Sequence, residues 1–172
     1  MPIPSAPLTE HLVREADALF LGLLRNALIG VYIIQDDLFR YVNPRFAEIF
    51  GYTQDEVCGR LGPADLIQPD DREKVRDAIG RRIDGRADTA HYTFRGAHRT
   101  RQPLELEVFG TRTDFGGKPA IIGMLIDITA RRSAERTATE QLNFIAQLIE
   151  AIPSPLFFKD EHARYLGCNK AF

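Results

Sequence analysis

The chain has 172 residues and a formal net charge of −2, and 44% of its residues are hydrophobic. This hydrophobic content is sufficient for a folded core, which argues against a chain that is disordered throughout. The balanced charge gives no reason to expect a nucleic-acid partner, which requires a basic surface. The two cysteines, Cys58 and Cys168, match no metal-ligand spacing, so we expect reduced thiols in a cytoplasmic protein.

The N-terminal residues 1–27 predict an amphipathic helix, with no signal peptide and no membrane segment. They contain no basic segment followed by an apolar one. The longest apolar run, residues 18–24, is interrupted by Gly22 and followed by Arg25, so it is too short to cross a bilayer. The helix has a wide apolar stripe that must pack against its own domain or a second copy of the helix. We expect this stripe to contribute Leu12, Ala16, Leu19, Phe20 and Leu23 to a dimer interface.

A β-hairpin is predicted next, from residue 30 to residue 42. Residues 30–34 are apolar and rich in β-branched side chains, and Asp36-Asp37 suits a tight turn before the return strand, residues 39–42.

Two short helices follow the hairpin. Asn43 as a cap and Pro44 at the first helical position begin the first helix, and Gly51 ends it. Thr53 and Glu56 have the spacing of a capping box, which begins the second helix.

The middle of the chain predicts one longer helix and three strands. The helix covers residues 70–83, with Asp70 or Asp71 as its cap. The strands cover residues 91–95, 103–111 and 120–128. The last strand is apolar on both faces, so we expect both faces to be covered. The inward side chains expected for the helix are Val75, Ala78, Ile79 and Ile83.

The pattern then changes to a charged, Ala-rich helix over residues 130–152, which Pro153 ends. Leu142, Ile145 and Ile149 recur at spacings of three and four, so we expect them in a dimer interface. Extended backward, the same seam is polar, which is typical of a weak coiled coil.

The last residues, 152–172, repeat the opening of the first domain. Phe157 and Phe158 correspond to the first strand, and Asn169 corresponds to Asn43, with one extra residue in the hairpin. A repeat of this size indicates tandem domains. We therefore predict an N-terminal helix at 1–27, a complete domain at 28–129, a linker helix at 130–151 and the truncated start of a second similar domain at 152–172.

This order of elements resembles a PAS domain, the sensory module of bacterial signalling proteins. The phrases that carry the resemblance are GVYIIQDDLFRYVNPRFAEIFGYTQDEVCGR, LIQPDDREKV, LELEVFGT, FGGKP and IIGMLIDITARRSAE. It covers residues 27–135 and again 152–172. It implies an α+β PAS fold: a five-stranded antiparallel sheet with short helices on one face, an N-terminal flanking helix and a C-terminal linker helix.

The most specific phrase is Asp127-Ile128-Thr129, at the end of the last strand. In PAS domains this element couples the sensory domain to the helix that follows, and the resemblance implies the same here. Independently, Thr129 is placed to cap the helix, and Asp127 lies near its positive end and within reach of Arg131. A partly exposed ion pair of this kind contributes about 0–1 kcal/mol. It is therefore better suited to setting the angle of the following helix than to stabilising the fold. The alternative is an ordinary helix cap.

The sequence identifies no single ligand. Flavin photosensors of the PAS family carry a reactive cysteine in the motif Gly-x-Asn-Cys-Arg-Phe on a pocket helix, whereas Cys58 lies in the different motif DEVCGR. The pocket helices, residues 65–83, contain no histidine to bind haem iron. We interpret His91 and His98 as solvated or structural. Binding of a small metabolite remains an open alternative. The inward candidates, which could equally fill a core, are Phe46, Leu66, Val75, Ile79, Tyr92, Phe94, Leu106, Val108, Ile122 and Met124.

Two arginines leave a further alternative. Arg95 and Arg99 could pair with an acidic metabolite, or they could be solvated at strand ends. No phosphate loop, nucleophile phrase or metal cluster supports catalysis, so we expect no enzyme activity in this stretch.

We expect a sensory and dimerising input module of a cytoplasmic bacterial signalling protein. It would form a homodimer, and its output domain, a histidine kinase or a diguanylate cyclase, would belong to the same polypeptide. The alternative is a ligand-free PAS module for dimerisation or partner docking.

Overall fold

The structure is a computed structural model, which describes Gly22 and residues 28–172. The predicted N-terminal helix lies outside the described residues. So do the dimer candidates Leu12, Ala16, Leu19, Phe20 and Leu23. The chain divides into two compact units, Met1–Thr129 and Ala130–Phe172.

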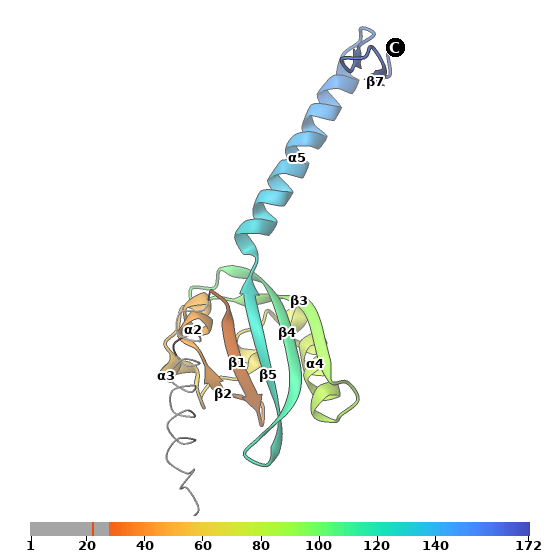
Figure 1. Cartoon of the computed structure of the whole chain (residues 1–172). Helices are drawn as coiled ribbons and strands as arrows, with labels where there is room; N and C mark the ends of the chain where they lie inside the picture. The colour runs from red at the N-terminus through yellow and green to blue at the C-terminus, as the bar shows by residue number, and fades with distance from the viewer. Residues whose placement is uncertain (1–21, 23–27) are drawn as a thin grey trace, which may run out of the picture. The chain divides into compact units, whose positions relative to one another are not determined.

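The first unit is built on a five-stranded antiparallel sheet in the order β2-β1-β5-β4-β3 (Figure 1). Asp36–Asp37 and Gly116–Gly117 close its two tight hairpins, and all four residues have positive φ, as the turn type that matches strand twist requires. The sheet and its order confirm the expected fold class. The strands are β1 Gly30–Gln35, β2 Leu38–Val42, β3 Thr89–Ala97, β4 Pro103–Phe115 and β5 Lys118–Asp127.

Short helices cover one face of this sheet (Figure 1). The first, α2, begins where Asn43 Oδ1 accepts a hydrogen bond of 2.9 Å from Phe46 N, and it ends at Gly51 with φ 80°. The next, α3, begins with the predicted capping box of Thr53 and Glu56. These caps confirm the expected helix starts. The helices are α2 Pro44–Phe50, α3 Gln54–Val57, the 3-10 helices η1 Pro63–Asp65 and η2 Pro69–Asp71, and α4 Arg72–Ile83.

Asp71 occupies the cap position of α4, but its carboxylate is used elsewhere. Its Oδ2 accepts from Arg95 N at 2.6 Å, and its Oδ1 accepts from Arg95 Nη2 at 2.8 Å. The side-chain hydrogen bond from Arg95 is the largest cause that lowers the pKa of Asp71. Asp71 therefore ties the start of α4 to β3.

The core lies between the helices and the inner face of the sheet. Ile121 and Leu125 of β5 are buried, whereas Ile122 and Met124 are 37% and 45% exposed. The described residues leave the outward side chains of this strand partly exposed, contrary to the prediction that both of its faces are covered. The reason is strand alternation, which turns successive side chains to opposite faces.

Helix α5, Thr129–Ala151, belongs to the second unit except for its first residue. The second unit also contains a hairpin of β6, Phe157–Lys159, and β7, Tyr165–Cys168. No residue of α5 is buried. Leu142 and Ile145 of the predicted seam are 68% and 52% exposed, and Ile149 lies beside them. No helix in the part of the chain that the structure describes is both long and apolar enough to cross a membrane.

Candidate functional site

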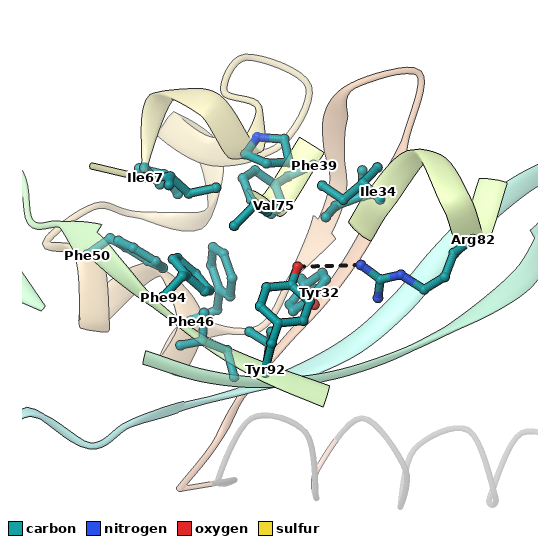
Figure 2. Close-up of a pocket in the computed structure, with 15 residues that line it drawn as sticks. Tyr32, Ile34, Phe39, Phe46, Phe50, Ile67, Val75, Arg82, Tyr92 and Phe94 are labelled. Atoms are coloured by element: carbon teal, nitrogen blue, oxygen red, sulfur yellow. Dashed lines mark hydrogen bonds between the residues drawn. The ribbon is translucent and has the colours of Figure 1, made fainter. Parts of the chain in front are cut away.

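A small cavity lies between the sheet and the helices of the first unit (Figure 2). Its volume is about 30 Å³, enough for about two water molecules or a solute of similar size. Most of its wall is aromatic or aliphatic. The predicted residues that line it are Phe46, Leu66, Val75, Ile79, Tyr92, Phe94 and Val108.

The remaining pocket candidates lie elsewhere. Leu106 is fully buried in the core but does not line the cavity. Ile122 and Met124 were expected to point inward, and this is wrong: they lie on the outward face of the sheet. The sequence could not decide the face, because β5 carries apolar side chains on both.

Among the described residues, one charged side chain lines the cavity, and the sequence had not pointed to it. Arg82 comes from α4 and is 1% exposed. Its Nε donates to Ala78 O at 2.9 Å, and its Nη2 donates to the Tyr92 hydroxyl at 3.5 Å. Its Nη1 is buried without a hydrogen-bond partner among the described residues. Figure 2 shows the guanidinium directed from α4 toward the tyrosine rings.

Helical spacing is the signal that would have found Arg82. Val75 and Ile79 line the cavity, and Arg82 follows at a spacing of three on the same face of α4. Spacings of three and four place side chains on one face of a helix. An arginine in this position is normally read as outward, because charged side chains are rarely buried without a partner.

Two tyrosine hydroxyls lie at the same end of the cavity (Figure 2). Burial raises the pKa of Tyr32, and the nearby Tyr92 adds to this rise. Burial also raises the pKa of Tyr92, against an opposing effect of Arg82. Both hydroxyls therefore keep their protons, so each has a hydrogen to donate.

A pair of glycines makes room for these polar groups. Gly110 of β4 lies opposite Gly123 of β5. A Cβ at Gly110 would overlap Nη1 of Arg82, and a Cβ at Gly123 would overlap the ring of Tyr32. Glycine within a strand often marks such a close approach, and this was a second available signal.

The surface arginines have protein partners and do not line the cavity. Arg95 pairs with Asp71 as described above, and Arg99 Nη1 lies 3.0 Å from Glu56 Oε1. The guanidinium of Arg99 also lies 5.3 Å from the ring centre of Tyr52. Both arginines are about half exposed, so these contacts favour the alternative that they are solvated at strand ends over binding of an acidic metabolite.

The histidines of this unit also lie away from the cavity. His91 stacks on Phe109 at 4.0 Å on the outward face, and its Nε2 lies 2.7 Å from Glu107 Oε1. His98 Nδ1 lies 2.8 Å from Thr100 Oγ1. Among the described residues there is no cluster of three or more side chains suited to a metal ion.

The outward face of the sheet carries a shallow apolar groove with a volume of about 490 Å³. Val31, Phe109, Ile122 and Met124 lie along it. An exposed apolar surface of this kind commonly marks a protein contact.

The junction, residues 127–129, connects the sheet to α5. Asp127 Oδ1 accepts a hydrogen bond of 2.9 Å from Thr129 N. The hydroxyl of Thr129 accepts from Glu105 N on β4 at 2.9 Å, and Ile128 N donates to Glu105 O at 2.9 Å. The start of α5 is therefore capped by Asp127, and Thr129 links β4 to the junction. This corrects the expectation that Thr129 is the cap, because Thr129 is itself the first helical residue.

Arg131 lies within the second unit. Its Nε lies 2.9 Å from Glu135 Oε1, a spacing of four along α5. The predicted pair of Arg131 with Asp127 stays a prediction.

Comparison with known families assigns the first unit. The PAS_4 model, described as a PAS fold, matches residues 29–133, and the chain therefore belongs to the PAS-fold family. PAS domains are sensory modules of signalling proteins, and they are typically not enzymes by themselves.

The curated relatives include a sensor protein. The chain is 36% identical over 52 residues to the virulence sensor protein BvgS of Bordetella pertussis. This match covers 30% of the chain and 4% of BvgS, so the chain spans only a small fraction of the curated relatives it matches.

Solved structures share the fold. The PAS domain of an HTR-like protein from Haloarcula marismortui is 21% identical with a TM-score of 0.59, and the match covers 70% of this chain and 98% of that one. A sensory box histidine kinase/response regulator from Burkholderia thailandensis is 25% identical with a TM-score of 0.53, covering 72% and 97%.

Proposed function

We propose that this chain is the sensory and dimerising input segment of a cytoplasmic bacterial signalling protein. The observation that carries the proposal is the short path from cavity to linker helix. Leu125 of β5 lines the cavity, and Asp127, further along the same strand, caps α5. On β4, Val108 lines the cavity, and Glu105 holds the junction.

The energetics of the junction suit a switch. A helix cap contributes about 0.5–2 kcal/mol, and an ordinary hydrogen bond contributes about 0.5–1.5 kcal/mol net. A ligand needs only a modest difference in affinity for two states to move such an equilibrium. A change at the cavity wall would alter the tilt or rotation of α5 through Asp127 and Thr129, with Arg131 on the first turn of the helix.

The linker helix is the proposed dimerisation element. The exposed Leu142 and Ile145 and the half-buried Ile149 lie on an apolar stripe that a second copy would cover. A polar first half and an apolar second half would leave the start of the helix free to move within a dimer.

The output is proposed to lie in a longer polypeptide, as a histidine kinase or a diguanylate cyclase domain. The hairpin of β6 and β7 would then begin a second PAS domain. Its exposed apolar side chains support this proposal, because a complete sheet would bury them: Phe157, Phe158, Tyr165, Leu166 and Phe172.

The test is Asp127→Ala in the longer protein that carries this chain, with output measured as phosphoryl transfer or cyclic dinucleotide synthesis. We expect a changed output and a thermal melt close to that of the wild type. Asp114→Ala is the matched control, because Asp114 Oδ1 accepts from Gly117 N at 2.9 Å in a turn remote from the junction. Unchanged output, or equal effects of the two variants, would contradict the coupling.

A second function, ligand-free docking or dimerisation, is favoured by the outward groove. Met124→Glu would place a carboxylate in it without entering the core, since Met124 is 45% exposed. If the groove forms the dimer, sedimentation of Met124→Glu should give monomers with wild-type circular dichroism. A dimer of unchanged affinity argues against this role.

A further inference from the structure

We propose that the cavity binds a small monocarboxylate, whose charged group is held by Arg82, Tyr32 and Tyr92. The idea that this anion is a signal rests on the sensory function proposed above. The binding itself rests on the geometry of the cavity and is tested separately.

The first argument is charge. Arg82 is 1% exposed, and an arginine stays positively charged under all conditions in which proteins fold. The described lining of the cavity contains no aspartate or glutamate. A buried cation is expensive unless an anion and hydrogen bonds compensate it. An anionic ligand at Nη1 would supply both.

The second argument is hydrogen-bond polarity. The polar groups of the wall are the guanidinium and two protonated hydroxyls. Tyr92 already accepts from Arg82 Nη2, so its own hydrogen remains to be donated. A guanidinium only donates. A carboxylate only accepts, and its hydrogen bonds to a charged donor are among the stronger ones in proteins. An amide or alcohol could also bond to the hydroxyls, but it carries no negative charge to pair with the guanidinium.

The third argument is size. A cavity of about 30 Å³ restricts the ligand to a very small solute, of which acetate is the simplest example. Ile34, Val75 and Ile79 supply an apolar wall for its alkyl group. A dicarboxylate would bury a second charge, and no second cationic side chain lines the cavity among the described residues.

The sheet itself is adapted to these groups. Gly110 and Gly123 face each other across β4 and β5, and a Cβ at either would overlap Arg82 or Tyr32. The space for Arg82 and Tyr32 is therefore provided by the backbone of β4 and β5, the same two strands that contact residues 127–129.

The experiment is a titration of the whole chain with sodium acetate, followed by ¹H–¹⁵N NMR at constant ionic strength. Acetamide is the neutral control of equal shape. We expect acetate to shift the amides around the cavity, with acetamide at least tenfold weaker and Arg82→Met abolishing the response to acetate. Equal binding of acetamide would overturn the proposal, and so would undiminished acetate binding by Arg82→Met.

Milder variants keep the test valid if Arg82→Met fails to fold. Arg82→Lys retains the charge and should bind acetate more weakly, and Tyr92→Phe should weaken acetate severalfold while leaving acetamide unchanged. Chloride is the last comparison. If chloride displaced acetate at an equal concentration, the carboxylate assignment would be overturned, because the site would then select its ligand by charge alone.

The two proposals fail in different ways. If acetate binds without any change in hydrogen exchange at the start of α5, the ligand proposal stands and the proposed coupling of the cavity to α5 is overturned. No acetate binding would overturn the ligand, while the Asp127→Ala experiment on output would still decide the coupling.

Discussion

The chain contains two hairpins with the same local hydrogen bonds, one in each unit. In the first, Val31 N donates to Asn43 Oδ1 at 2.8 Å, and Asn43 N donates to Val31 O at 2.9 Å. In the second, Leu156 N donates to Asn169 Oδ1 at 2.9 Å, and Asn169 N donates to Leu156 O at 2.9 Å. Both asparagines are buried, with exposures of 0% and 3%.

The two hairpins differ in what surrounds them. Phe46, which follows Asn43, is 1% exposed, whereas Phe172, at the same distance from Asn169, is 60% exposed. Tyr32, next to Val31, is 4% exposed, whereas Phe157, next to Leu156, is 48% exposed. Local sequence is therefore sufficient for the hydrogen bonds of this element, but burial of its aromatic side chains requires strands from elsewhere in a sheet.

The largest expected difference is at the phenylalanines. Phe46→Ala should destabilise the first unit by about 3–5 kcal/mol, because it leaves a cavity in the core. Phe172→Ala is the matched control and should change that transition by less than about 0.5 kcal/mol. Urea unfolding followed by circular dichroism measures both, and similar losses would contradict the comparison.

The asparagines should differ next. Asn43→Ala should cost the first unit about 2–3 kcal/mol, because it leaves the amides of Val31 and Phe46 buried without an acceptor. Asn169→Ala should leave the same transition unchanged, since the bonds described for Asn169 lie within the second unit. The measurement is again urea unfolding, and an equal effect of the two variants would refute the prediction.

Alkaline pH should reveal the buried hydroxyl that only the first hairpin has. Burial raises the pKa of Tyr32 in the folded state well above the value of about 10 that a tyrosine has in the unfolded chain. Its contribution to stability is therefore complete below pH 10 and is lost as pH rises above 10, by about 1.4 kcal/mol per pH unit. Tyr32→Phe should lose less stability than the wild type between pH 10 and 11. Equal losses of unfolding free energy in Tyr32→Phe and the wild type would contradict this prediction.

The smallest effect is expected at an ion pair that both hairpins share. Arg40 Nη2 lies 2.9 Å from Asp36 Oδ2, and Arg164 Nε lies 2.8 Å from Asp160 Oδ2. Because Arg40 and Asp36 are both substantially exposed, Arg40→Ala should cost less than about 1 kcal/mol.

In the second hairpin the observable is the carboxyl group itself. Hydrogen bonds from Arg164 and His162 lower the pKa of Asp160, so Arg164→Ala should raise it, as carbon-detected NMR titration will show. If the pKa of Asp160 is unchanged in Arg164→Ala, the ion pair of the second hairpin does not form in solution, and this prediction is wrong.

Local elements were predicted well because their causes lie within a few residues. The cap at Asn43, the capping box at Thr53 and Glu56 and the turn at Gly116-Gly117 each depend on side-chain oxygens or backbone freedom close by in the chain. The PAS resemblance rested on the same kind of phrase, repeated in order, and the family match confirms it.

Tertiary structure alone decided the rest. The inward face of β5 depends on its register against β1 and β4, so Ile122 and Met124 were placed on the wrong side. Thr129 was predicted as a cap, but the amide of a distant residue, Glu105, lies close enough to bond its hydroxyl.

Arg82 shows the same limit most clearly. Its place on the face of α4 was determined by sequence spacing, but its burial depends on the space that Gly110 leaves on the distant strand β4. Interactions between neighbours in the chain act through residue type alone, whereas a buried site needs groups that only the folded sheet brings together. The sequence by itself therefore determined the caps, turns and order of elements, and the fold decided which side chains meet in the cavity.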